Sequence, residues 1–106
     1  MQINISTRHG EISTATQEKI KQKVEKLQRF FERLTAIHVT VDLSKADEPN
    51  MEVIAQAEHK NDFVASHQSK DMFGSLDQAI SKLEQQVKKY KEKVQSHGRP
   101  APIDEE

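Results

Sequence analysis

The chain has 106 residues, 34% of them hydrophobic and 31% charged, which predicts one domain with a modest core and no room for a deep catalytic cavity. Its 16 Lys and Arg residues nearly cancel 17 Asp and Glu residues, so only the distribution of charge can indicate a partner. The absence of cysteine excludes disulfides, thiolate metal sites and thiol chemistry. Because there is no signal-peptide pattern and no apolar run approaches the ~20 residues of a membrane span, we expect a cytoplasmic protein without a membrane partner.

The first two elements are a short strand and a long helix. Residues 2–6 alternate, with Ile3 and Ile5 on one side, which predicts a strand with one buried face. Ser13 or Thr14 then stands where a helix N-cap is expected. The predicted helix covers about 14–34, with Phe30 at the edge of an apolar stripe formed by Ile20, Val24, Leu27, Phe31 and Leu34.

The charges of this helix are sorted by sign. Glu18, Glu25 and Glu32 follow one flank of the stripe, and the opposite flank carries Lys19, Lys23, Lys26, Arg29 and Arg33. Only Glu25 has a basic residue four positions later, so salt bridges along the helix do not explain the pattern. The sorting favours a nucleic-acid contact over an ordinary solvated face.

Three strands follow the first helix. Residues 36–44 alternate between apolar and polar side chains, a polar turn covers 44–50, and alternation resumes over 51–58. Lys60, Asn61 and Asp62 are expected to form a hairpin turn before a last strand over 63–68. The element order is then β-α-β-β-β-α.

The stretch 70–95 predicts a second long helix, with Asp71 as its N-cap. Its apolar stripe consists of Met72, Phe73, Leu76, Ile80, Leu83, Val87 and Val94. Lys82, Lys89 and Lys93 cluster on the side away from this stripe. Taken alone, the pattern is typical of a solvated helix end; beside the basic flank of the first helix, it indicates a second basic surface.

These elements predict an α+β fold, a two-layer sandwich with both helices on one face of a four-stranded mixed sheet, like a double-stranded-RNA-binding domain. The domain covers 1–95, and an acidic disordered tail covers 96–106. The open sheet face carries acidic residues and no aromatic ring, so it is unsuited to stacking bases. RNA, if bound, should meet the helices.

No constellation of catalytic residues is present. The five histidines lack the close spacings of metal sites, and the chain has neither a G-x-S-x-G nucleophile elbow nor a phosphate-binding glycine loop. We therefore expect a protein that is not an enzyme and has no metal, no cofactor and no small-molecule substrate.

The segment ASHQSKDMFGSLDQAISKLEQQVKKYKEK resembles the signature of the ribosome hibernation factors, the hibernation-promoting factor and ribosome-associated inhibitor A group, also called the sigma-54 modulation protein family. INIS…EIS and KLQRFFERL match as well, so the resemblance covers nearly all of 1–93. The departures are Gln85 in place of a usual arginine, Phe73 in place of tyrosine, and Gly74 and Ser75 in place of small helix formers. The length predicts the short form, without the C-terminal dimerisation domain of longer relatives.

The resemblance implies a function in translation. It implies that the domain binds the small ribosomal subunit and its rRNA in the assembled ribosome, fills the channel of messenger and transfer RNA, and represses translation in stressed or stationary-phase cells, with a monomeric free protein. The basic contacts of the family carry over to Lys23, Lys26, Arg29, Lys82, Lys89, Lys91 and Lys93, and the helical wheel adds Lys19 and Arg33. Two alternatives stay open: an RNA-binding or transcription-linked regulator that acts on structured RNA, or a protein-interaction module that uses the open sheet face.

Overall fold

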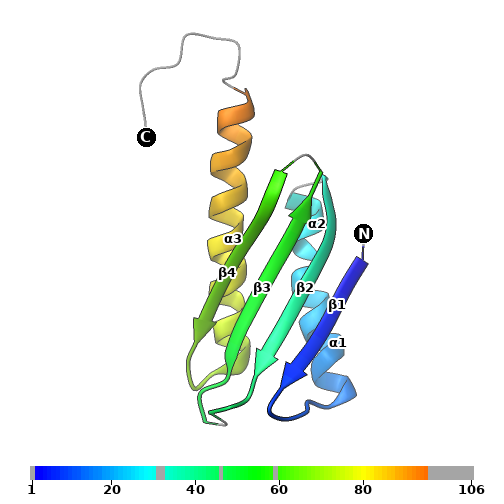
Figure 1. Ribbon diagram of the computed structural model, residues 1–106, viewed down its shortest axis with the longest axis vertical. Coiled ribbons are helices and arrows are strands. Elements are labelled where there is room, and N and C mark those ends of the chain that lie inside the picture. Colours follow the sequence, from blue (N-terminus) through cyan, green and yellow to red (C-terminus); the bar gives the residue numbers. More distant parts are fainter. Residues whose placement is uncertain (1, 31–32, 46, 59, 96–106) are drawn as a thin grey trace.

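The structure is a computed structural model that describes residues 2–30, 33–45, 47–58 and 60–95. Its elements are, in chain order, β1 (Gln2–Arg8), α1 (Thr14–Val24), α2 (Lys26–Phe30), β2 (Leu34–Asp42), β3 (Asn50–Ala57), β4 (Lys60–Gln68) and α3 (Met72–Gln95). Figure 1 shows the four strands as one sheet, with the helices packed against a single face of it. The predicted two-layer α+β architecture and its β-α-β-β-β-α order are confirmed, with α1 and α2 together in the place of the first helix.

The sheet has the strand order β1-β2-β3-β4. β1 and β2 are parallel, whereas the β2–β3 and β3–β4 pairs are antiparallel, so the sheet is mixed as predicted. Parallel neighbours require a crossover connection, and α1 and α2 supply it. β1 and β4 are therefore the edge strands.

The register places apolar side chains on the helix-facing side of the sheet. Ile5 is opposite Val39, Val39 is opposite Val53, and Val53 is opposite Ala65. Val39 and Val53 are fully buried, while the next row, with Thr40 opposite Glu52, lies on the other face. This alternation is the period of two that the sequence shows.

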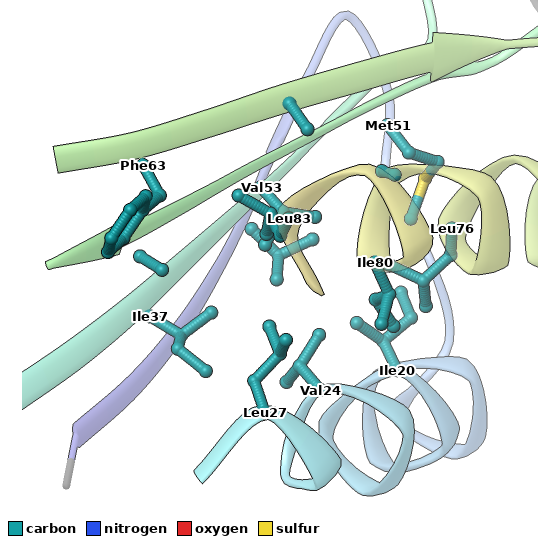
Figure 2. Close-up of a cluster of buried hydrophobic side chains, with 14 of the residues drawn as sticks. Ile20, Val24, Leu27, Ile37, Met51, Val53, Phe63, Leu76, Ile80 and Leu83 are labelled. Carbon is teal, nitrogen blue, oxygen red and sulfur yellow. The ribbon is translucent and has the colours of Figure 1, made fainter. Parts of the chain in front are cut away.

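The helices complete the core from the other side. α1 and α2 bury Ile20, Val24 and Leu27, and α3 buries Leu76, Ala79, Ile80, Leu83 and Val87. Figure 2 shows the side chains of Val24, Leu27 and Ile37 pointing into the same apolar space from α1, α2 and β2. The predicted stripes of both helices are confirmed for these buried residues, except that Ala79 was not among those predicted; Phe31 and the side chain of Val94 lie outside the described part of the structure.

Side-chain caps fix the starts of the two long helices. The Ser13 hydroxyl accepts a hydrogen bond from the Thr16 N–H at 3.1 Å, and the Asp71 carboxylate accepts one from the Gly74 N–H at 3.0 Å. Both caps satisfy backbone donors that the first helical turn leaves unpaired. A Cβ at Gly74 would stand 2.6 Å from Asp71 Oδ2, so glycine leaves room for this cap. The cap prediction for Asp71 is confirmed.

Two predicted boundaries were wrong. The first helix is interrupted at Glu25 and its second part ends at Phe30, so Leu34 belongs to β2, where it pairs with Ala57. A buried leucine fits a helical stripe and a strand face equally well, and pairing with β3 decides between them. The turn expected at 60–62 is instead the start of β4, with Lys60 opposite Ala57. The predicted tail at 96–106 lies outside the described residues.

Candidate nucleic-acid interface

The helical layer holds the described members of the predicted basic set. α1 and α3 run in the same direction on one face of the sheet (Figure 1). Their contacts occur in chain order, since Lys19 lies over the ring of Phe73 and Lys23 pairs with Asp77 one turn later in both helices. Parallel helices at close range place one flank of α1 against one flank of α3.

Two lysines on the basic flank of α1 contact side chains of α3. The Lys19 Nζ atom lies 4.5 Å from the centroid of the Phe73 ring. Lys23 Nζ lies 3.0 Å from Asp77 Oδ1 and 3.3 Å from Asp77 Oδ2. The Lys23 side chain is only 23% exposed, against 57% for Asp77. The positive charge of Lys23 is therefore partly balanced inside the helical layer.

Lys91 joins α3 to the end of α2. Its ammonium donates a hydrogen bond to the Phe30 carbonyl oxygen at 3.1 Å and lies 5.5 Å from the centroid of the Phe30 ring. The last carbonyls of a helix have no partner within the helix, and a lysine that bonds one of them caps the helix end. Lys91 thus fixes the end of α2.

Lys82 lies on the opposite flank of α3, beside the edge of the sheet. Its ammonium donates to the Ser66 carbonyl oxygen at 2.8 Å, and Gln86, one turn later, donates to the Val64 carbonyl oxygen at 2.9 Å. Both acceptors belong to the edge strand β4. Lys89 follows Lys82 by two helical turns and is exposed on the same flank. The basic flank of α3 therefore lies along β4 and does not face α1.

The rest of the predicted set is open to solvent where the structure describes it. Lys26, Arg29 and Arg33 are exposed on α2 and the turn after it. The side chain of Lys93 lies outside the described part. Lys88 is also exposed on α3 and is absent from the predicted set, because the helical wheel places it between the two flanks. A helical wheel of α3 that includes the solvent side, opposite the apolar stripe, predicts Lys88 as an exposed cation.

The opposite face of the sheet has a different character. Its described residues include Asn4, Thr40, Glu52 and Ser66 and, as predicted, no Phe, Tyr or Trp side chain; the imidazole of His38 also lies on this face. An apolar pair on this face was not predicted from the sequence: Ile54 is opposite Val64, and Val64 is 47% exposed. The His38 Nδ1 atom lies 3.3 Å from the Asn4 amide nitrogen, and with no Phe, Tyr or Trp beside it this face offers no row of rings for stacking successive bases.

One carboxylate at the end of β2 has a shifted pKa. Asp42 accepts hydrogen bonds from the Ser44 N–H at 3.0 Å and pairs with the His9 ring at 3.1 Å. The Ser44 N–H, and after it the His9 contact, hold the pKa of Asp42 below its ordinary value. His9 adopts a left-handed backbone conformation with φ of 62°, which turns the chain after β1. This contact stabilises the loop and does not form a reactive site.

Within the described residues, no group of three or more His, Asp or Glu side chains is placed to hold a metal ion. Among the described helices, none combines the length and the apolar character needed to cross a membrane.

Residues 3–95 match the model of a family described as sigma 54 modulation protein / S30EA ribosomal protein. The chain belongs to this family. It is 31% identical over 104 residues to a ribosome hibernation promoting factor of Pseudomonas putida, covering 91% of this chain and 92% of that protein. A protein of the same name from Klebsiella oxytoca is 32% identical over 100 residues, and the alignment covers 92% of this chain and 100% of that protein.

Solved structures share the fold. A ribosomal subunit interface protein from Coxiella burnetii superposes with a TM-score of 0.77 at 25% identity, covering 87% of this chain and 99% of that chain. The N-terminal domain of Thermus thermophilus Protein Y gives a TM-score of 0.72 at 22% identity, covering 85% of this chain and 99% of that chain, and shows the fold alone. The family expected from the sequence resemblance is confirmed.

For this family member, the structure divides the expected contacts into three groups. Lys19, Lys23 and Lys91 lie where the helices meet, Lys82 and Lys89 lie beside β4, and Lys26, Arg29 and Arg33 are exposed around α2. We call these eight residues the basic helical face. All eight are on or beside the helices, so the described members of the predicted basic set belong to the helical layer.

Proposed function

We propose that this protein is a ribosome hibernation factor that acts in the cytoplasm. In this proposal it binds the small ribosomal subunit through rRNA phosphates, fills the channel of messenger and transfer RNA, and represses translation in non-growing cells. Two relatives named ribosome hibernation promoting factor align with this chain along more than nine-tenths of their own length, which supports the proposal. Inhibition by occupation of a site needs no chemical reaction.

The observation that carries the proposal is the basic helical face. Lys26, Arg29 and Lys89 are exposed, and their side chains can reach an RNA backbone without unfolding any element. Double-stranded RNA is bound mainly through its shape, phosphates and 2′-hydroxyls, because side chains cannot read its deep major groove. Cations distributed over two helices suit that mode of binding.

The lysines that already have a partner can still contribute. An ammonium group has three N–H donors, and the bond from Lys82 to the Ser66 carbonyl uses one of them. The same holds for Lys91, which donates to the Phe30 carbonyl. These contacts hold each ammonium in place and leave donors for a phosphate. Lys23 is the weakest member, since Asp77 balances its charge.

Charge reversal tests the proposal. The test variant carries Lys26→Glu, Arg29→Glu and Lys89→Glu, and the matched control carries Lys21→Glu, Lys45→Glu and Lys70→Glu, all six residues being exposed. Both variants change the net charge equally, so a difference between them reports position alone. Each is pelleted with purified small subunits, large subunits and 70S ribosomes at one fixed salt concentration, and a free RNA hairpin is titrated in parallel.

The test variant should lose small-subunit binding and inhibition of in vitro translation, and the control should keep both. Equal losses from the two variants would show that the binding surface lies elsewhere. Binding of the wild-type chain to the free hairpin as tightly as to the small subunit would instead favour a general regulator of structured RNA. Circular dichroism of all variants establishes that they are folded.

A further inference from the structure

Phe30 is an exposed aromatic side chain at the end of α2. It is 36% exposed and, with Val64, is one of two large hydrophobic residues that the described part of the chain leaves open to solvent. It lies outside the buried core, although an apolar ring is normally more stable when it is buried. This exposure leaves part of the ring accessible to a ligand.

Phe30 has cations close to it in the chain and one in direct contact. Lys26 is one helical turn before it, Arg29 is its neighbour in the chain, and all three are exposed, as is Arg33 in the turn after α2. The fourth cation, Lys91, lies 5.5 Å from the ring centroid and also bonds the Phe30 carbonyl, so it holds the ring from α3. One face of the ring is thus next to an ammonium, and Phe30 keeps an exposed fraction of 36%.

We propose that Phe30 is a stacking site for an unpaired RNA base, with Lys26, Arg29 and Arg33 holding the adjacent phosphates. This inference rests on the proposed function and specifies the RNA feature that the end of α2 recognises. Aromatic rings stack on bases that have left a helix, and any base offers a suitable face. A ring next to phosphate-binding cations is the combination that single-stranded RNA sites use.

Val64 provides an internal comparison. It is the more exposed of the two residues but has no ring, and it lies on the open sheet face opposite Ile54, with Asn4 and His38 in the same row. Lys82 lies nearby, bonded to the Ser66 carbonyl, so this site has a cation beside it but no ring. If simple exposure of an apolar side chain promoted binding, the two sites would behave alike.

The first experiment measures the affinity of small subunits for Phe30→Leu, Phe30→Tyr and the control Val64→Leu at one salt concentration. Loss of the ring in Phe30→Leu should weaken binding about five- to 150-fold, the effect of losing one base stack, whereas Phe30→Tyr keeps a ring and should stay near the wild type. Val64→Leu should have no effect. Wild-type affinity in Phe30→Leu would overturn the inference, while failure of the wild type itself to bind subunits would overturn the proposed function.

A second experiment detects stacking without ribosomes. The chain has no tryptophan, so Phe30→Trp and Val64→Trp each carry one fluorescent reporter. A short labelled oligoadenylate, whose binding is followed by its anisotropy, should quench the emission of Trp in Phe30→Trp and leave that in Val64→Trp unchanged. A blunt RNA duplex, which offers no unpaired base within its length, should quench neither. Binding of the oligoadenylate without quenching, or no binding at all, would contradict the stacking site.

Discussion

The Lys82 ammonium lies 2.8 Å from the carbonyl oxygen of Ser66, and Gln86 makes the equivalent bond to Val64 at 2.9 Å. Alternate residues of a strand direct their carbonyls to the same side, so both bonds cover the same edge of β4. An uncovered edge strand is a template for pairing with another chain. These two side chains of α3 therefore protect the edge of the sheet.

Removal of this cover should cause self-association. The double variant Lys82→Ala, Gln86→Ala frees both carbonyls of β4, and sedimentation velocity should show its average mass rising with concentration. The melting temperature should change little, because the freed carbonyls can bond water. The matched control Gln85→Ala, Lys88→Ala removes the same residue types from exposed positions of α3 and should stay monomeric. If both variants stay monomeric, the edge needs no such protection.

Asp77 should weaken ribosome binding in the wild-type protein. Asp77→Asn removes a negative charge from the helical layer and releases Lys23, so affinity for small subunits should rise about two- to fivefold, the range of a partly exposed ion pair. Stability should fall by less than about 1 kcal/mol, since the Asp77 carboxylate is more than half exposed and solvent screens the pair. Glu84→Gln removes an equal charge from the same flank without releasing Lys23, and should have the smaller effect. An unchanged affinity in Asp77→Asn would show that Lys23 does not contact RNA.

Salt should weaken the complex steeply. If about six phosphates are neutralised, affinity falls roughly a thousandfold between about 50 and 200 mM salt, because bound counterions are released on association. Lys89→Gln should reduce the slope of log affinity against log salt by about one. Equilibrium binding at several salt concentrations measures both quantities. A nearly flat response would rule out phosphate contacts as the source of affinity.

Asp42 should make stability depend on pH in the acid range. The Ser44 N–H and the His9 contact lower the pKa of Asp42 in the folded state, so its carboxylate stabilises the fold above the ordinary aspartate pKa of about 3.9. That stabilisation is lost as the pH falls through the lowered pKa. Asp42→Asn should therefore melt below the wild type at pH 7, and the difference should shrink in strong acid. A difference that is constant with pH would mean that the charge of Asp42 is not involved.

The sequence by itself determined the elements, their buried faces and the family. Alternation predicted the strands, and the stripe from Leu76 to Val87 predicted the long helix, because these periods follow from the geometry of one element. The cap at Asp71 is equally local, since donor and acceptor are three residues apart. The basic residues of the helical layer could be recognised for the same reason.

Only the tertiary structure decided which partners those residues have. Leu34 suits a helix or a strand, and its pairing with Ala57 resolved the choice. The pairs Lys23–Asp77 and Lys82–Ser66 join residues that are 54 and 16 positions apart, so no period along the chain can reveal them. They arise because α1 and α3 pack in parallel on one face of the sheet and α3 lies along its β4 edge. Packing places the basic flank of α1 on one side of α3 and the basic flank of α3 itself on the other side, beside β4. The sequence of each helix predicts its own flank but not the position of one flank relative to the other.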